Sequence, residues 1–229
     1  MSAAVTDHPS LRRRARARRL RGLYAVTPEV GDTRVLLSKI TAALEGGACA
    51  VQYRNKNARD ALREEQAFAI ARVQAARAAL YIVNDDPVLA ARVGADGVHI
   101  GEGDPSIGSA RELIGPDRII GVSCYGDFER ARAAVEAGAD YVAFGSFFPS
   151  STKPAARRAG LELLRRAQDL GVPVIAIGGI DASNARTLID EGADAVAVIG
   201  AIFGHDDPAD IRAAAQSIAT LAAREPRAH

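Results

Sequence analysis

An alternation of short apolar runs with alanine-rich helical patterns, repeated eight times, limits the fold of this chain more than any other feature. The apolar runs are candidate strands, and they lie near Leu23–Thr27, Ala50–Gln52, Leu80–Val83, Val98–Ile100, Ile119–Val122, Tyr141–Phe144, Val174–Ile177 and Ala195–Ile199. The helical patterns include Ala58–Arg77 and Phe128–Ala137, and a last helix is expected from about Pro208 to Ala223. Because strands that alternate with helices pair in parallel through helical crossovers, we expect an α/β protein with a parallel sheet.

Eight such units in 229 residues fit a closed (β/α)8 barrel, the TIM barrel, better than an open doubly wound sheet. The glycine-rich fingerprint of dinucleotide-binding open sheets is absent from the sequence. Periodicity alone does not prove closure, so the open sheet stays the alternative. No long linker or break in composition interrupts the pattern, and residues 22–229 are therefore expected to form a single barrel domain.

A short sequence motif recurs at the point where three of the helical patterns end. Gly94–Val98 reads GADGV, Gly138–Val142 reads GADYV and Gly192–Val196 reads GADAV, with Gly46–Gln52, GGACAVQ, as a looser copy. Each glycine fits the position just after a helix, where the backbone adopts positive φ, and the apolar residues that follow predict a buried strand.

The first 21 residues differ from the rest because they are rich in arginine. Leu11–Gly22 reads LRRRARARRLRG. A cluster of this kind can bind nucleic acid, but no aromatic residue lies among the arginines and no nucleic-acid motif follows. We expect residues 1–21 to be a poorly ordered basic tail, and nucleic acid is not an expected partner.

Bulk properties exclude several other classes of protein. The formal net charge is +1, and no apolar run is long enough to span a bilayer or to act as a secretory signal. The two cysteines, Cys49 and Cys124, lie far apart without metal-ligand spacing. We expect a cytoplasmic protein with no membrane partner, and the sequence leaves a homo-oligomer open.

Polar residues gather after the predicted strands, where the active site of a barrel lies. After the second strand, VQYRNK places Gln52, Arg54 and Lys56 at alternate positions, so that their side chains point the same way from an extended segment. A helix start does not need cations, because positive charge there opposes the helix dipole. The cluster therefore predicts an anion site, although a charged loop is the plainer alternative.

Acidic residues follow the third and fourth strands. In IVNDD, Asp86 precedes Pro87 and is a natural N-cap, which leaves Asn84 and Asp85 without such a role. In GVHIGEGDPS, Asp104 also precedes a proline and could likewise be a cap. Taken together, the carboxylates Asp85 and Asp104 on neighbouring strand ends and the cations Arg54 and Lys56 close to them are the groups needed to bind Mg²⁺ and a polyphosphate.

The loops after the last strands contain glycine pairs. Ala176–Ile180 reads AIGGI and Val198–Ala201 reads VIGA, and glycines there let backbone N–H groups approach a phosphate. The linker GSFFPSSTKP after the sixth strand adds hydroxyl groups and Lys153 between the two anion sites. No Ser-His-Asp, Cys-His or HExxH arrangement is present, and His99 is more readily explained as a structural histidine than as a base. These features suggest a transferase that joins two phosphorylated small molecules.

Eight motifs in order resemble one family, thiamine-phosphate synthase, over roughly Leu23 to Ala223. They are LYAVT, VQYRNK, IVNDD, GADGVHIGEGD, IIGVSCY, GSFFPSSTKP, AIGGI and AVIGAIF. The resemblance implies that the barrel is a catalytic domain. It would join hydroxymethylpyrimidine diphosphate to hydroxyethylthiazole phosphate, giving thiamine phosphate and pyrophosphate with Mg²⁺ as cofactor.

The resemblance also implies roles for individual residues. Those expected to bind the pyrimidine diphosphate are Gln52, Arg54, Lys56, Asn84, Ser123 and Lys153, of which Arg54, Lys56, Ser123 and Lys153 would assist catalysis. Those expected to hold the thiazole phosphate are Ser150, Thr152, Gly179, Ile199 and Gly200. Asp85 and Asp104 would be the magnesium ligands.

This chain departs from the family pattern at several positions. Residues 150–153 read SSTK where the family often has TPTK, with a hydroxyl kept at Ser150. Asp86, Glu102, Tyr125 and Gly200 also differ from the residues that are usual at those positions. Glycine at Gly200 removes a hydroxyl that could bind phosphate and leaves backbone N–H donors. The alternative functions are a thiazole phosphate tautomerase on a related barrel, which would need no magnesium pair, and nucleic-acid binding through the basic tail.

Overall fold

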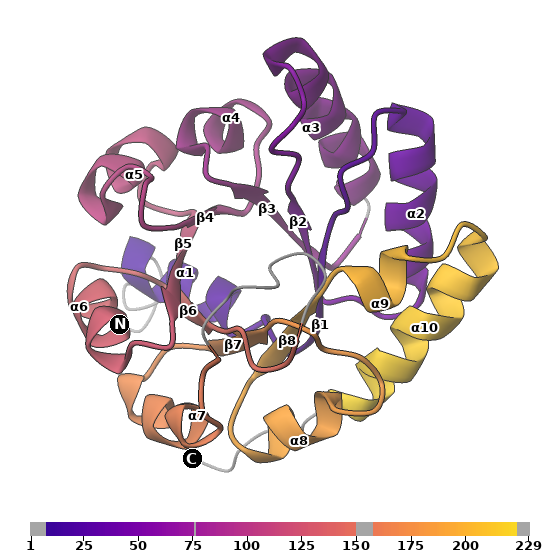
Figure 1. The fold of residues 1–229 in the computed structure, drawn as a ribbon. Helices are drawn as coiled ribbons and strands as arrows, with labels where there is room; N and C mark the ends of the chain where they lie inside the picture. Colours follow the sequence, from indigo (N-terminus) through magenta and orange to yellow (C-terminus); the bar gives the residue numbers. More distant parts are fainter. Residues whose placement is uncertain (1–7, 76, 150–157, 224–229) are drawn as a thin grey trace, which may run out of the picture.

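The computed structural model describes residues 8–75, 77–149 and 158–223, and Figure 1 shows the eight strands arranged in a ring inside an outer layer of helices. The strands are β1 Gly22–Val26, β2 Ala50–Tyr53, β3 Leu80–Asn84, β4 Gly97–Ile100, β5 Ile119–Tyr125, β6 Tyr141–Phe144, β7 Val174–Ile177 and β8 Ala195–Val198. Each pairs in parallel with the next, and β1 pairs with β8, with Leu23 opposite Val196. The barrel is closed, which confirms the (β/α)8 prediction and excludes the open sheet.

A helix follows each strand on the outside of the barrel, and all but the last of these helices lead to the next strand. They are α2 Thr33–Glu45, α3 Asp60–Gln74, α4 Pro87–Arg92, α5 Ile107–Ile114, α6 Phe128–Glu136, α7 Glu162–Ala167, α8 Ala185–Asp190 and α10 Pro208–Leu221. Three further elements are α1 Pro9–Ala17 before the barrel, the 3-10 turn η1 Gln168–Leu170 after α7 and the short α9 Gly200–Phe203 after β8. Aspartates accept hydrogen bonds from backbone N–H groups at the starts of four of these helices: Asp32 (α2), Asp86 (α4), Asp127 (α6) and Asp207 (α10).

The strands have two apolar faces because successive side chains point to opposite sides of a strand. In β1, Leu23 and Ala25 belong to the cluster between the strands and the helices, whereas Tyr24 and Val26 belong to a second cluster inside the barrel. The inner cluster fills the barrel below the site, so the strands hold the residues at their carboxyl ends on a packed support.

The recurring GAD motif has the positive φ angles that its glycines predict. Gly94, Gly138 and Gly192 have φ angles of 69°, 101° and 118°, and each lies between a helix and the next strand. In the looser copy the second glycine, Gly47, takes the positive φ of 94°. These positions favour glycine because other residues are strained there.

Residues 8–21 differ from the expected poorly ordered tail. They contain helix α1, and they pack against the barrel interior through Ala17, the last residue of α1, and Leu20, which follows the helix, with exposed fractions of 1% and 0%. In Figure 1, which looks along the barrel, α1 is drawn faintly behind the strands. It closes the end of the barrel opposite the carboxyl ends of the strands. Residues 1–7 of the predicted tail lie outside the described part of the chain.

Arg12, Arg13 and Arg16 of α1 form ion pairs with carboxylates near the starts of the strands. The Nε atom of Arg13 lies 3.1 Å from Oδ1 of Asp140, directly before β6. The Nε atom of Arg16 lies 3.5 Å from Oδ1 of Asp96, directly before β4. These contacts give the basic segment a structural role, which its composition alone did not indicate.

Across residues 8–75, 77–149 and 158–223, no helix combines the length and the apolar character that crossing a membrane requires.

Candidate active site

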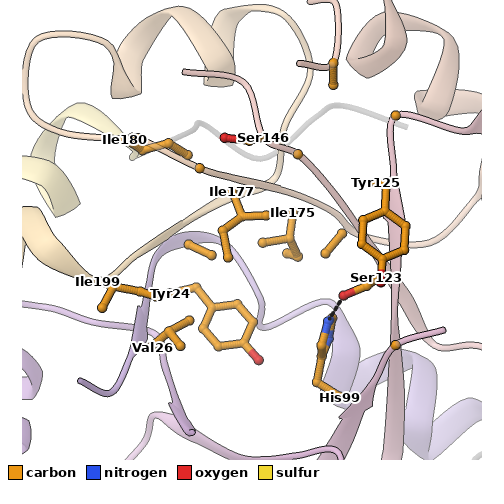
Figure 2. Close-up of a pocket in the computed structure, with 18 of the residues that line it drawn as sticks. Tyr24, Val26, His99, Ser123, Tyr125, Ser146, Ile175, Ile177, Ile180 and Ile199 are labelled. Carbon is orange, nitrogen blue, oxygen red and sulfur yellow. Dashed lines mark hydrogen bonds between the residues drawn. The ribbon is translucent and has the colours of Figure 1, made fainter. Parts of the chain in front are cut away.

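One cavity of about 1550 Å³ opens at the carboxyl ends of the strands. Its lining includes every predicted site residue that the structure describes: Gln52, Arg54, Lys56, Asn84, Asp85, Asp104, Ser123, Gly179, Ile199 and Gly200. Ser150, Thr152 and Lys153 lie outside the described residues. Figure 2 shows the cavity wall near Ser123, with Tyr24 and Val26 of β1 opposite it.

The cationic side of the cavity is held by hydrogen bonds at the end of β2. The backbone N–H of Arg54 donates to Oγ1 of Thr27 at 2.9 Å, and this hydroxyl donates in turn to the carbonyl of Arg54 at 3.1 Å. The guanidinium of Arg54 pairs with Glu29, with 3.2 Å between Nη1 and Oε1. Lys56 is about half exposed and reaches across to the next strand, where its Nζ lies 2.8 Å from Oδ2 of Asp85.

The two predicted metal ligands lie together. The carboxyl groups of Asp85 and Asp104 are within hydrogen-bonding reach of each other. Asp104 is turned toward the cavity because its Oδ2 accepts a hydrogen bond from the backbone N–H of Gly101 at 2.6 Å. Asp85 has a φ of 64°, a left-handed conformation that aspartate tolerates better than most residues. The acids therefore point toward each other.

The pKa values of the two acids move in opposite directions. Burial raises the pKa of Asp104, and the nearby Asp85 carboxylate raises it further. Burial opposes the charged form of Asp85 as well, but the hydrogen bonds from Lys56 and Asp104 outweigh it and lower the pKa of Asp85. Two like charges this close are stable only if a proton or a cation lies between them.

This donor set fits a magnesium ion. Mg²⁺ binds in proteins through one or two carboxylates, with substrate phosphate oxygens and water completing its octahedral coordination. Within the described residues no group of three or more His, Cys, Asp and Glu side chains is gathered, so no all-protein cage is formed there. The pair Asp85 and Asp104 thus fits a metal held jointly with a phosphorylated substrate.

Two helix caps distinguish the functional candidates from structural acids. Asp86 caps α4, with its Oδ1 accepting from the N–H of Leu89 at 2.8 Å, as predicted. Asp104 is not a cap, because Ser106 caps α5 by accepting from the N–H of Ser109 at 3.2 Å. The capping alternative for Asp104 was therefore wrong.

The loops after β7 and β8 bring backbone to the other side of the cavity. Gly178 and Gly179 have φ angles of 108° and 63°, and a Cβ on Gly179 would lie 2.2 Å from the carbonyl oxygen of Pro149. Only glycine fits here without displacing the β6 loop. Ile199 and Gly200 follow β8, and Gly200 is the first residue of α9.

Sequence reasoning missed a chain of five hydrogen-bonded side chains, four of which line the cavity. It runs from Gln52 through Tyr24 and Tyr141 to His99 and Ser123. The available signal was the presence of two tyrosines, in LYAVT and GADYV, at inward-facing positions of the first and sixth strands. Burial lowers the pKa of His99 to about 4, so its ring is neutral near pH 7, in keeping with a structural histidine.

Tyr125 is a second feature that strand periodicity did not show. The sequence predicted that the fifth strand ends at Val122, but β5 continues to Tyr125 through a register shift between Ser123 and Tyr125. Tyr125 has a φ of 53°, and the guanidinium carbon of Arg130 lies 5.5 Å from its ring centroid. The irregularity places both Ser123 and Tyr125 on the cavity wall (Figure 2).

A family model described as thiamine monophosphate synthase matches residues 23–202. The chain belongs to this family. Among curated proteins, the thiamine-phosphate synthase of Thiobacillus denitrificans is 52% identical over 206 residues, covering 90% of this chain and 96% of that protein. That of Chromobacterium violaceum is 52% identical over 201 residues, covering 88% and 96%.

Solved structures agree with the family. A thiamine phosphate pyrophosphorylase from Pyrococcus furiosus superposes with a TM-score of 0.78 at 38% identity, covering 90% of this chain and 96% of that one. A Bacteroides thetaiotaomicron thiamine phosphate pyrophosphorylase, at 20% identity and a TM-score of 0.64, supports the fold alone. Family and fold together make this chain an enzyme of thiamine phosphate synthesis, a transferase on a TIM barrel.

Proposed function

We propose that the chain joins 4-amino-2-methyl-5-hydroxymethylpyrimidine diphosphate to 4-methyl-5-(2-hydroxyethyl)thiazole phosphate and releases pyrophosphate. The observation that carries the proposal is the arrangement of Lys56, Asp85 and Asp104, a cation next to two paired carboxylates on one cavity wall. A diphosphate with magnesium needs such a mixed set of charges, whereas a single phosphate does not.

The residues of this chain divide between the two substrates. Arg54 and Lys56 would hold the diphosphate, together with Asn84 at the end of β3. The backbone at Gly179 and Gly200 would hold the thiazole phosphate on the other side of the cavity. Ser150, Thr152 and Lys153 remain predictions for the loop between them. Binding both partners in one cavity sets the thiazole nitrogen near the pyrimidine methylene.

Charge on the leaving group is the main demand of this reaction. As the diphosphate departs, negative charge grows on its bridging oxygen, and Arg54 and Lys56 stabilise that charge. Magnesium, when bound to Asp85 and Asp104, supplies further positive charge for the same purpose. The thiazole nitrogen attacks with its own lone pair, so no side chain has to remove a proton from it. This accounts for the lack of a catalytic base in the sequence motifs.

The test replaces Asp85 with an uncharged residue of the same shape. Asp85→Asn is preferred to alanine because asparagine tolerates the φ of 64° at this position. We expect kcat/KM for thiamine phosphate formation to fall by about 100-fold or more, the scale on which lost electrostatic stabilisation acts. Purified protein would be assayed for pyrophosphate release with both substrates, with and without EDTA.

Asp86→Asn is the matched control. It removes a carboxylate one residue away, but asparagine still caps α4, so activity and melting temperature should change little. Near-normal turnover in Asp85→Asn, or full activity in EDTA, would contradict the metal role. A thiazole phosphate tautomerase, the alternative, would convert a thiazole tautomer without metal and would tolerate Asp85→Asn.

A further inference from the structure

A continuous hydrogen-bonded chain crosses the barrel interior and ends at the active-site cavity. Its first two links are Nε2 of Gln52 to the Tyr24 hydroxyl at 2.9 Å, and that hydroxyl to the Tyr141 hydroxyl at 3.0 Å. The next two are the Tyr141 hydroxyl to Nδ1 of His99 at 3.1 Å, and Nε2 of His99 to Oγ of Ser123 at 2.9 Å. Figure 2 shows the last link, with Ser123 between His99 and Tyr125. We refer to these five residues as the relay.

Chemistry at the Gln52 end fixes the direction of every bond in the relay. An amide nitrogen can only donate, so the Tyr24 hydroxyl accepts from Gln52. Tyr24 is fully buried, and in the described residues its hydroxyl has Tyr141 as its other polar contact, so the Tyr24 proton points to Tyr141. The Tyr141 proton is then directed to Nδ1 of His99.

The same reasoning sets the state of the histidine and the serine. Because Nδ1 accepts from Tyr141, a neutral His99 carries its proton on Nε2 and donates it to Oγ of Ser123. Ser123 therefore uses one lone pair inside the barrel and keeps its own proton and one lone pair for the cavity that it lines. If the hydrogen bonds ran in the opposite direction, Ser123 would donate its hydroxyl proton to Nε2 of His99, and only its lone pairs would face a ligand.

The strand register places His99 and Tyr141 on either side of Gly121. His99 pairs with Gly121, and Gly121 pairs with Tyr141, across β4, β5 and β6. A Cβ on Gly121 would lie 1.9 Å from Cζ of Tyr141. Glycine at this position therefore lets the tyrosine ring lie over β5 and bring its hydroxyl to His99.

We propose that Tyr24, Tyr141 and His99 are positioning residues that keep the Ser123 hydroxyl both a donor and an acceptor toward an aminopyrimidine. The edge of that ring has a nitrogen lone pair next to an amino N–H, which is the complement of one O–H donor beside one lone pair. The inference rests on the proposed function for the identity of the ring. The relay is thus a specificity device for the pyrimidine substrate.

The tautomer of His99 tests the relay without any substrate. The chain has four histidines, so ¹⁵N-histidine labelling gives a simple spectrum, and His99→Gln assigns the relevant signals. At pH 8 we expect the neutral Nε2–H form in the wild type and a shift toward Nδ1–H in Tyr141→Phe. An Nδ1–H tautomer in the wild type would show that the bonds run the other way and would overturn the proposal.

Kinetics test whether the relay affects substrate selection. Tyr141→Phe should raise KM for the pyrimidine diphosphate by about 3- to 10-fold, the effect of one net hydrogen bond. KM for the thiazole phosphate should stay within about twofold. Tyr81→Phe is the matched control, since it removes a buried tyrosine hydroxyl that donates to the Ala67 carbonyl at 3.0 Å outside the relay. It should lower the melting temperature by a similar amount and leave both KM values unchanged.

A double variant separates positioning from general loosening of the core. If Tyr141 acts through Ser123, then adding Tyr141→Phe to Ser123→Ala should produce no further rise in KM for the pyrimidine diphosphate. Independent, multiplying effects would overturn the proposal, as would equal changes in both KM values. A wild type with the expected tautomer that makes no thiamine phosphate would instead contradict the proposed function and leave the hydrogen-bond direction established.

Discussion

Asp85 and Asp86 are adjacent in the sequence but have different roles, one in the cavity and one at the start of a helix. Both are carboxylates at the end of β3, yet Asp86 accepts the N–H of Leu89 and Asp85 meets Lys56 and Asp104 in the cavity. The motif IVNDD separates the two roles because the proline after Asp86 marks the first turn of a helix. Local rules therefore identified the cap, and the remaining acid became the candidate ligand.

The buried histidine makes stability depend on pH. Burial lowers the pKa of His99 from 6.5 to about 4, so between these values the unfolded chain binds a proton that the folded chain does not. The contribution to stability is thus complete above the unfolded pKa and is lost as pH falls toward 4. We expect the histidine to reduce the free energy of unfolding by about 3 kcal/mol between pH 7 and pH 4.

The measurement is urea denaturation across this pH range, in EDTA so that no divalent ion reaches Asp85. His99→Gln removes the titrating ring and puts a neutral amide in its place. The difference in pH dependence between wild type and variant isolates the histidine from the carboxylates, which titrate in both proteins. Parallel curves for the two proteins would show that His99 is not buried in its neutral form.

Gly121 tests the close packing under the relay. Alanine there would place its Cβ on the ring of Tyr141, so we expect a loss of about 2–3 kcal/mol in unfolding free energy, as for other overpacked cores. Gly108→Ala is the opposing control, because Gly108 is exposed in α5 and its Cβ would meet only Oγ of Ser106, at 3.9 Å. That change should stabilise by about 0.5–1 kcal/mol. If urea denaturation gave the same change in unfolding free energy for Gly121→Ala and Gly108→Ala, the packing argument would be contradicted.

Helices and strands were predictable where the local sequence pattern was strong. They were missed where their formation depends on contacts with residues far away in the sequence. The strands Tyr141–Phe144 and Val174–Ile177 have the predicted bounds, because an apolar run between turn residues defines each of them. Helix α1 was missed because its order depends on Asp96 and Asp140, far away in the sequence, and arginine-rich composition alone resembles a solvated tail. The extension of β5 to Tyr125 likewise depends on pairing with β6.

The segment that contains α1 should stabilise the barrel without affecting catalysis. Leu20 is fully buried in the inner cluster, so Leu20→Ala should cost about 3 kcal/mol of unfolding free energy. Leu11→Ala is the control within the same segment, since Leu11 is 40% exposed and should cost about 0.5 kcal/mol. Both variants should keep kcat/KM within about threefold, because the cavity lies at the other end. A large loss of activity in Leu20→Ala, measured well below its melting temperature, would contradict this separation.

At the scale of the whole molecule, closure of the barrel brings distant motifs to one cavity. The sequence predicted the residues at each strand end, and alternation favoured closure, but only the pairing of β1 with β8 establishes the ring. The relay could not be predicted, because it joins side chains from β1, β2, β4, β5 and β6 whose contacts depend on the register of the strands. Local motifs thus define which groups reach the cavity, and register defines which of them touch.

The ring also separates the two anion sites, and this gives a prediction for binding. β3, which places Asp85, and β7, which places Gly179, are four strands apart in a ring of eight, so they lie on opposite sides of the cavity. We expect Arg54→Ala to weaken binding of inorganic pyrophosphate with Mg²⁺ by about 10- to 100-fold, as for a lost charged hydrogen bond. It should leave the Kd of the thiazole phosphate unchanged.

Gly179→Ala should have the opposite selectivity, because its Cβ would meet the Pro149 carbonyl and displace the backbone that faces the thiazole phosphate. Isothermal titration calorimetry of each ligand with the wild type and both variants measures the four changes. Each variant acts as the control for the other, because general damage to the fold would weaken the binding of both ligands to both variants. A wild type in which pyrophosphate and the thiazole phosphate compete would instead mean that the cavity holds one shared anion site, and the joining of two phosphorylated molecules would lose its structural basis.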